Sequence, residues 1–441
     1  MKLNTLFLAF LAGMLLFSCS SDDGGTTPVD PNPEPENSAP EINAISFSKL
    51  ESISDEDIIG NVQATDDDGD ELDYEITSNS NNLFEIADNG DLSLVSGANL
   101  DFEDAQQHVI TIQVSDTENQ ASAQITINVE NVIESLFEDS ESFITTWKTP
   151  ADDFELVIGT DSTFDYNFTI DWGDGSDEET FVDLAENPSH VYATEDTYTI
   201  AIKGTFPAIK MYEMDNEALG NSQKALLGIS QWGAVIWESF EEAFKDCSNL
   251  SEYSAEDQPD LSNVQSMAQM FSGAASFNGA IGDWNTLNVV DMSLMFINAN
   301  AFNQDIGGWK TQNVTNMVGM FGNLADNENS SFNQDISGWD VSKVNFFTNM
   351  FAGNNAFDRN LGGWDISSVV SMINMFNDSG MSSENYSNTL IGWDDQGDIP
   401  GDIILGATGI KYLCSANMAR SNLLGRGWII DDEGSDPTVC P

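Results

Sequence analysis

Clustered carboxylates are the residues of this sequence whose type and spacing could do chemistry. Acidic groups stand at Asp66-Asp-Asp-Gly-Asp70, at Leu100-Asp-Phe-Glu103 and at Val114-Ser-Asp116. Hard carboxylate oxygens gathered in loops are the ligands that Ca²⁺ takes, about six to eight at a time. The pattern therefore indicates a calcium site, and the alternative is a set of ordinary solvated acidic turns.

Catalytic chemistry has weaker support. The chain has only two histidines and four cysteines, and it has no phosphate-binding glycine loop. A zinc site, a Cys–His pair or a Ser-His-Asp set is therefore not indicated. Paired carboxylates are too abundant for counting to exclude a glycosidase, but most of those in the repeat region stand at repeating or solvated positions. We predict that the chain is not an enzyme and has no catalytic residues.

The segment that must position the acids is rich in strands. Residues 39–131 alternate in polarity, as in Ile110–Val114 and Ala123–Val129, with turn clusters in between, which predicts an all-β sandwich. Asp70 and Glu71 lead straight into a strand without flanking helices, so an EF-hand loop does not fit. The same segment holds 21 acids and one lysine. Severe self-repulsion is expected unless a cation relieves it.

Together these acidic groups resemble a cadherin repeat over residues 39–133. The resemblance implies Ca²⁺ as the cofactor, although only one repeat is visible and the linker motif is reduced to Asn131-Val-Ile-Glu134. It places the ligands on the Asp-x-Asp motif, the Leu-Asp-x-Glu motif, a later Asp and a first-strand Glu. In this sequence they are Asp66 and Asp68, Asp101 and Glu103, Asp116, and Glu51, acting as one group of Asp66, Asp68 and Asp116 and another of Glu51, Asp101 and Glu103.

Residues 137–207 are expected to form a second sandwich. The stretches Trp172-Gly-Asp-Gly175 and His190-Val-Tyr192 resemble the two signatures of PKD domains, which as a family are spacers and interaction modules. Asp174-Gly175 suits a tight hairpin turn, and Trp172 and Tyr192 supply core area. His190 is therefore predicted to be a core or turn residue and not a catalytic or metal-binding one.

A repeat dominates the second half of the chain. Met-Phe recurs at 270, 295, 320, 350 and 375, and the one long interval carries five extra residues around 325–329. A fixed period in this range is typical of a stacked array. The spacing predicts one short strand per unit, as at Phe277–Ile281, a turn at the Gly-Trp corner and one short helix, as at Val264–Phe271.

The repeat region resembles a known family over residues 225–395. Glu242–Leu250 is similar to the leucine-rich repeats of BspA-like surface proteins, and the Met-Phe units look like a variant common in bacterial surface lipoproteins. The resulting fold class is two all-β sandwiches followed by a leucine-rich-repeat-like α/β solenoid with a C-terminal cap at 396–441. Ala416–Gly425 has helix-like spacing there, and Cys414 and Cys440 are candidates for a disulfide. Cys247 is expected to be a small buried hydrophobe.

The start of the chain is expected to anchor it. Residues 1–18 have signal-peptide proportions, and Leu16-Phe-Ser-Cys19 looks like a bacterial lipoprotein box, so Cys19 would carry lipid. Ser20-Ser-Asp-Asp23 resembles the surface-export pattern of Bacteroidota lipoproteins, which implies a lipid-anchored outer-membrane protein at the cell surface. Residues 19–38 then form a flexible tether. The alternative is a cleaved soluble secretory signal.

The net charge and the repeats limit the functions that the chain could have. With 13 basic and 74 acidic residues the net charge is −61, which argues against nucleic acid as a partner. We predict an adhesion lipoprotein whose partners are cell-surface proteins or glycans, contacted at rows such as Asn303 and Gln304 with Asn333 and Gln334. The alternative is a carbohydrate-binding lipoprotein that uses repeated tryptophans as sugar platforms. These are Trp284, Trp309, Trp339, Trp364 and Trp393.

Overall fold

The structure is a computed structural model, and it describes residues 36–79, 81–324, 329–436 and 438. The predicted lipidation site Cys19, residues 325–328 of the insertion, and Cys440 lie outside the described residues. The chain divides into two compact units, Met1–Val132 and Ile133–Pro441, and each is described by itself.

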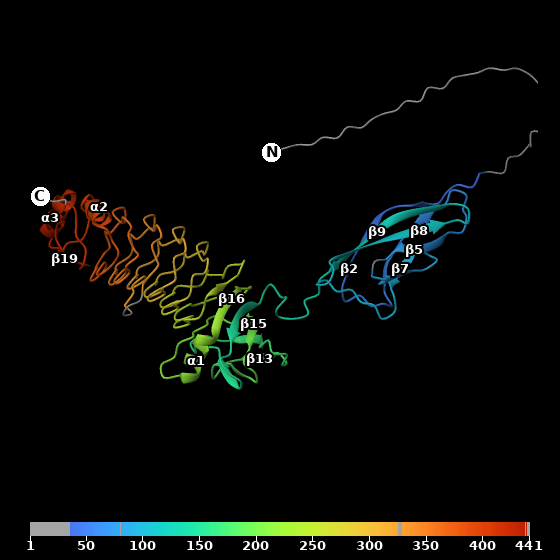
Figure 1. The fold of residues 1–441 in the computed structure, drawn as a ribbon, viewed down its shortest axis with the longest axis horizontal. Coiled ribbons are helices and arrows are strands. Elements are labelled where there is room, and N and C mark those ends of the chain that lie inside the picture. The colour runs from blue at the N-terminus through green and yellow to red at the C-terminus, as the bar shows by residue number, and fades with distance from the viewer. Residues whose placement is uncertain (1–35, 80, 325–328, 437, 439–441) are drawn as a thin grey trace, which may run out of the picture. The chain divides into compact units, whose positions relative to one another are not determined.

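The first unit is a β-sandwich, which confirms the prediction from its alternating strands (Figure 1). One sheet has the order β2-β9-β8-β5 and the other β3-β7-β6, and β2 runs parallel to β9. Ile110, Ile112 and Val114 are buried on one side of β8, as the period of two requires. The strands are β1 (Glu41–Ile42), β2 (Ile45–Leu50), β3 (Ile58–Asn61), β4 (Ala64–Thr65), β5 (Asp73–Ser78), β6 (Phe84–Ile86), β7 (Asp91–Leu94), β8 (Gln107–Ser115) and β9 (Gln120–Glu130).

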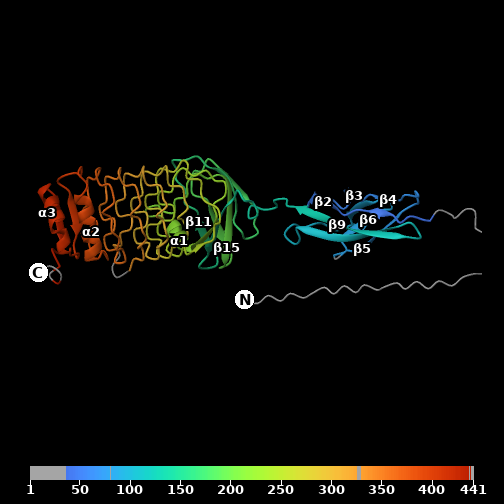
Figure 2. The same ribbon diagram turned by 90° about the horizontal axis from the view of Figure 1, so that it is seen from above.

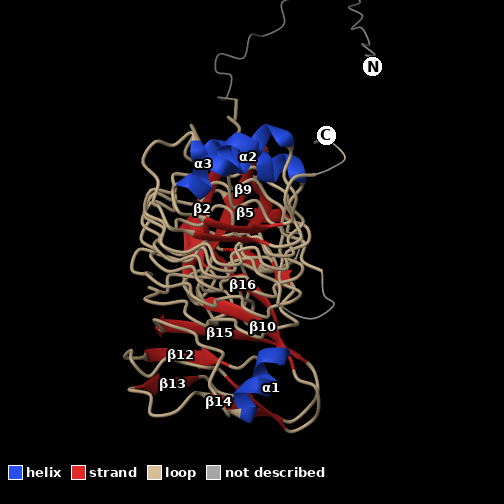
Figure 3. Cartoon of the chain, turned by 90° about the vertical axis from the view of Figure 1, so that its left-hand side faces the viewer, coloured by secondary structure: helices blue, strands red, loops and turns tan. Residues whose placement is uncertain are grey.

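A six-stranded sheet opens the second unit and continues into the repeat region. Strand β10 pairs with β15 on one side and with β16 on the other, as Figure 3 shows. The segment 137–207 and the first coil of the array therefore share one sheet and one core. The elements are β10 (Phe143–Lys148), β11 (Phe154–Val157), β12 (Asn167–Asp171), β13 (Glu179–Val182), β14 (Ser189–Tyr192), β15 (Thr197–Thr205), α1 (Glu217–Ala225), β16 (Leu226–Gln231) and β17 (Glu252–Tyr253).

The repeats form stacked coils, and the predicted helix in each unit is wrong (Figure 2). Between β17 and α2 the described residues contain no helix. Alternate backbone N–H groups donate to the next coil, as Met267 does to Asp291 and Gln269 to Ser293. Those in between donate three residues back, as Met270 does to Met267. The predicted strand at 277–281 is likewise absent, and the parallel bridges lie in the segment expected to be helical, at Ser266, Asp291, Asn316, Phe346 and Ser371.

Left-handed residues are the physical reason for the missing helices. Each coil has a positive φ at the residue directly before its Met-Phe pair, from 54° to 59° in five successive coils. A right-handed helix cannot pass through such a residue. The residues are Gln269, Leu294, Gly319, Asn349 and Asn374.

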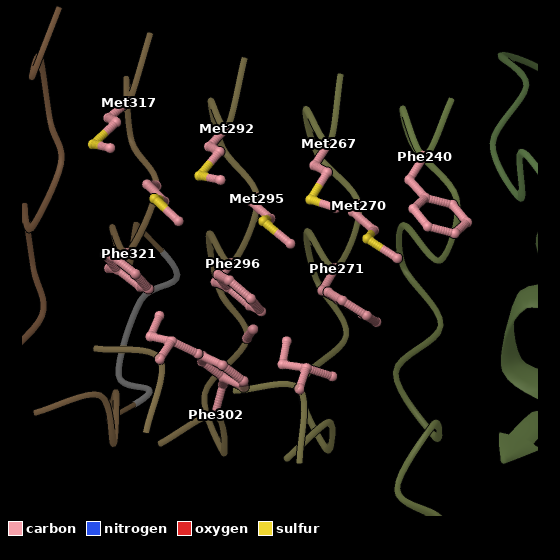
Figure 4. Close-up of a cluster of buried hydrophobic side chains, with 14 of the residues drawn as sticks. Phe240, Met267, Met270, Phe271, Met292, Met295, Phe296, Phe302, Met317 and Phe321 are labelled. Atoms are coloured by element: carbon pink, nitrogen blue, oxygen red, sulfur yellow. The ribbon is translucent and has the colours of Figure 1, made fainter. Parts of the chain in front are cut away.

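Aromatic columns fill the array (Figure 4). Phe271, Phe296 and Phe321 stack coil on coil with ring centroids 5.6 and 5.7 Å apart. A second column begins with Phe277 and Phe302, and the two columns touch at 3.9 Å between Phe271 and Phe277. Since every such ring is covered by its neighbours, no single coil could bury its apolar face alone.

The C-terminal end of the array is closed by helices. Ser382 is the N-cap of α2 (Ser383–Asp394), and its side chain accepts the N–H of Asn385. α3 (Asn417–Gly425) falls within the predicted helical stretch. β18 (Ile404–Ala407) and β19 (Ile429–Asp432) form a parallel pair, and η1 is the short turn Cys414–Ala416. Leu423 of α3 is buried, whereas Met418 and Leu424 are exposed.

The cysteines fit their predicted surroundings as far as the structure describes them. Cys414 is disulfide-bonded, while Cys440 lies among the residues that are not described. Cys247 is free and fully buried, and burial raises the pKa of its thiol well above the ordinary value. Of the helices described, none is both long and apolar enough to cross a membrane.

Candidate calcium site

Glu51 is the centre of the candidate site. It follows β2 directly and is only 6% exposed. Its Oε2 accepts the backbone N–H of Phe102 and its Oε1 that of Val132, both at 2.6 Å. A buried carboxylate held in this way joins three chain segments that are distant in sequence.

Two further carboxylates complete the predicted second group. Glu51, Asp101 and Glu103 each offer an oxygen, and these atoms lie within 4.8 Å of one another. The Nδ2 of Asn131 donates to Glu103 at 2.9 Å, and Asp101 accepts the N–H of Asp104. Three like charges this close repel one another, and a divalent cation is the chemical species that offsets such repulsion. The residues present therefore fit calcium.

The first predicted group, Asp66, Asp68 and Asp116, does not form such a cluster in the described structure. Asp66 Oδ1 accepts the N–H groups of Asp68 and Gly69, while its Oδ2 is buried without a hydrogen-bond partner in the described structure. Asp116 is buried. The backbone N–H of Asn119 lowers its pKa, burial opposes this, and the N–H of Glu118 and the Asn37 amide lower it further. Among the described residues, only Glu51, Asp101 and Glu103 form a group of three within ligand distance.

Asn37 and Ser38, which the sequence places in the tether, contact two of the predicted ligands. The Nδ2 of Asn37 donates to Asp116 at 3.1 Å, and the N–H of Ser38 donates to Asp68 at 2.6 Å. These two residues thus connect two of the predicted ligands. Their position directly before the first strand, and an amide side chain among acids, are the signals that could have found them.

The repeated tryptophans are buried, so the alternative in which they act as sugar platforms is wrong. All five are at most 4% exposed. Trp309 Nε1 donates to the Ile281 carbonyl at 3.0 Å, and Trp339 and Trp364 repeat the contact one coil further on each time. Their faces are covered by neighbouring rings, as between Trp309 and Trp339 at 6.3 Å. A buried indole cannot present a face to a sugar.

The amide rows form ladders, as predicted, but the ladders bond coil to coil. Asn303 Oδ1 accepts the N–H of Asn333 at 3.0 Å, and Gln334 Nε2 donates to the Asn303 carbonyl at 2.8 Å. Arg359 takes the place of the glutamine in the next coil and donates to the Asn333 carbonyl. Much of the hydrogen-bonding capacity expected to face a partner is therefore used inside the array.

His190 is a packing residue, as predicted. Its ring stacks on Trp172 with centroids 5.2 Å apart and meets Tyr192 edge-on at 4.8 Å. Its Nε2 lies 2.8 Å from Asp174 Oδ2. Partial burial raises the pKa of Asp174, but hydrogen bonds from Ser176 and His190 outweigh it and bring the pKa to about 2.

Comparison with known protein families gives a match within the first unit. Residues 45–130 match the model of the cadherin domain. Residues 238–328 and 324–393 match a family described as Mycoplasma protein of unknown function, DUF285. No curated protein matches the chain. The first unit is thus a cadherin-like repeat.

Solved structures of cadherin domains are similar to the chain. They include human protocadherin-24 EC1-2, at 22% identity over 25% of this chain and 48% of that one, with a TM-score of 0.20. The third cadherin domain of human protocadherin 7 is 16% identical over 24% of this chain and 98% of that one, with a TM-score of 0.21. The chain spans about half the length of the protocadherin-24 structure.

Proposed function

We propose that this chain is a surface-anchored adhesion protein whose cadherin-like repeat is stiffened by calcium. The observation that carries the proposal is the cluster of Glu51, Asp101 and Glu103 on a cadherin-like repeat. The ion would supply positive charge among three carboxylates, and the chain's own residues supply the rest.

Those residues tie the end of the repeat together. Glu51 extends from the end of β2, its oxygens hold the N–H groups of Phe102 and Val132, and Glu103 accepts from Asn131. Neutralising the cluster would remove the repulsion that loosens these contacts. A bound cation therefore fixes the direction in which the chain leaves the repeat at residues 131–132, which suits a repeat that transmits load.

The rest of the chain has supporting roles in this proposal. Lipid at Cys19 holds the chain to the outer membrane, the PKD-like segment acts as a spacer, and the BspA-type repeat array meets a cell-surface protein or glycan. Support comes from the sequence resemblances and from the stacked geometry of the array. The chain is proposed to bind rather than to catalyse.

Adhesion of beads coated with the chain tests the proposal. We expect beads to adhere to cells in millimolar calcium and to detach in excess chelator. Glu51→Gln should adhere weakly in both conditions, because it removes one charge from the cluster. The matched control is Asp88→Asn, an exposed acid outside the cluster, which should behave as the parent. Parent beads that adhere in excess chelator as well as they do in calcium, or Glu51→Gln beads that adhere in calcium as the parent does, would refute the role of calcium.

A further inference from the structure

A concave pocket lies in the second unit, between strand β11, strand β14 and helix α1. Its volume is about 530 Å³, which is within the range typical of small-molecule sites, about 300 to 1,000 Å³. Four segments that are distant in sequence line it, within 155–157, 160–166, 184–189 and 210–219. The pocket is therefore separate from the coils of the array and from the candidate calcium site.

The floor of the pocket belongs to the core of the second unit. Val157, Tyr166 and Leu219 line it and are at most 6% exposed. The hydroxyl of Tyr166 donates to the Ala208 carbonyl and accepts the N–H of Asp161, which fixes this wall. The pocket is thus preformed, with an apolar base on which the C–H groups of a ligand can be buried.

Two side chains at the pocket have donors that the fold leaves unused. Lys210 Nζ lies 3.6 Å from a carboxylate oxygen of Asp161 and 3.6 Å from one of Glu242, which is longer than a hydrogen bond. Among the described residues its N–H groups have no acceptor at hydrogen-bond distance. Asn187 accepts the N–H and the hydroxyl of Thr160 with its Oδ1, and its Nδ2 has no acceptor in the same part of the chain. A ligand that fits here must therefore accept hydrogen bonds.

The carboxylates of the pocket need the opposite kind of partner. Glu155, Asp161, Glu186 and Glu213 line the pocket, and Lys210 is the one basic residue among the lining side chains. An anionic ligand would meet four negative charges. A cationic ligand would leave the donors of Lys210 without a partner. Hydroxyl groups both donate and accept, so a neutral ligand with several hydroxyls satisfies both sets.

We propose that this pocket binds a neutral sugar residue of a cell-surface glycan. Its hydroxyls pair with Lys210, Asn187 and the carboxylates, and its C–H groups lie on the apolar base. Phe164, a partly buried ring packed against the core, adds aromatic area to the wall. The inference goes beyond the proposed function, because it places a glycan site outside the array and does not depend on calcium.

Beads coated with the chain from residue 20 onward test the proposal on a printed glycan array in excess chelator. Many copies of the chain on each bead make weak binding detectable, and chelator removes any contribution of calcium. The array carries neutral glycans, acidic glycans and lysine-rich peptides as separate probes. The beads should bind a subset of the neutral glycans and neither of the charged classes.

Substitutions in the pocket should weaken that binding. Titration calorimetry with the best neutral glycan of the array should show at least tenfold weaker binding for Lys210→Met and for Glu186→Gln, because each removes a hydrogen bond to a charged group. The matched controls are Lys148→Met and Glu195→Gln, exposed residues of the same unit outside the pocket, which should bind as the parent does. Glu186 is exposed, so its variant should fold even if the loss of the Lys210 ion pairs destabilises the other, and melting curves check this.

Three results would overturn the proposal. The first is that the beads bind no neutral glycan, or bind only the acidic glycans or the lysine-rich peptides. The second is that Glu186→Gln binds the glycan as tightly as the parent. The third is that the control variants lose binding to the same extent as the pocket variants, which would place the effect outside the pocket.

Discussion

Single residues show what type and spacing can and cannot reveal. The repeated position of Trp309 and its equivalents could be seen in the sequence. Their exposure could not, because it depends on the stacking of neighbouring coils, which buries the indoles. Glu51 was found through the cadherin resemblance. Its hydrogen bonds to Phe102 and Val132 depend on how the strands pair, and no local pattern contains that information.

Trp309→Ala should destabilise the second unit by roughly 3 to 5 kcal/mol, because it leaves a cavity between two stacked coils. Trp309→Phe keeps part of the ring area but removes the indole donor to the Ile281 carbonyl, which still accepts the N–H of Trp284, so the lost hydrogen bond should cost about 1 kcal/mol. Denaturant unfolding would measure both. A near-silent Trp309→Ala would mean that the indole is not part of the core.

The pairing of Asp174 with Ser176 and His190 predicts an acid-sensitive contact. The pKa of Asp174 is lowered from 3.8 to about 2 in the folded chain. Its contribution to stability is therefore present above pH 3.8 and is lost as the pH falls toward 2, and because the group is partly solvated it is on the order of 1 kcal/mol. Asp174→Asn should lower stability at pH 6 and flatten its dependence between pH 4 and 2. An unchanged slope in acid titrations of unfolding would contradict this.

The secondary-structure elements of the array show where apolar spacing gave a wrong prediction. The 25-residue period predicted a stack, and the stack is present. The i, i+3, i+6, i+7 spacing of Val264 to Phe271 predicted a helix, but it equally fits a chain of turns in which every third residue faces inward. The deciding residues are the left-handed ones inside the segment, of which Gly319, Asn349 and Asn374 are residue types that tolerate such backbone, whereas Gln269 and Leu294 gave no such signal.

Gly353→Ala should destabilise the array strongly. Gly353 has φ 72°, and a Cβ there would lie 1.9 Å from the Asn323 carbonyl oxygen. The left-handed backbone alone costs roughly 1 to 2 kcal/mol, and the clash adds to it. Gly338→Ala is the matched control, since a Cβ at Gly338 meets nothing within 4 Å. Similar melting temperatures for the two variants would refute the account of the coil backbone.

The whole molecule is organised by charge. Residues 39–131 hold 21 acids and one lysine, whereas residues 261–393 hold 11 acids and three basic residues. This contrast was readable from the sequence and marks the first of the two segments as the one proposed to bind a cation. The sheet joining β10 to β16 was not readable, because pairing between distant strands leaves no local trace.

The proposed lipid anchor predicts a change of compartment. Cys19→Ala should release a soluble or unprocessed chain from the membrane fraction, because in the proposal the thiol of Cys19 carries lipid. Fractionation and surface labelling of cells would measure this. If the variant fractionates and is displayed as the parent is, the lipoprotein interpretation is wrong.

Calorimetry on the full chain, in millimolar calcium and in excess chelator, tests the central claim most directly. Calcium at about a hundredfold its dissociation constant should add roughly 2.7 kcal/mol to the cadherin-like repeat, which raises its melting temperature by roughly 11 to 22 °C. The transition of the second unit should not move. Glu51→Gln should reduce the shift, and Asp88→Asn should keep it. A first transition that melts alike in calcium and in chelator would contradict the claim and leave Glu51, Asp101 and Glu103 as an ordinary acidic turn.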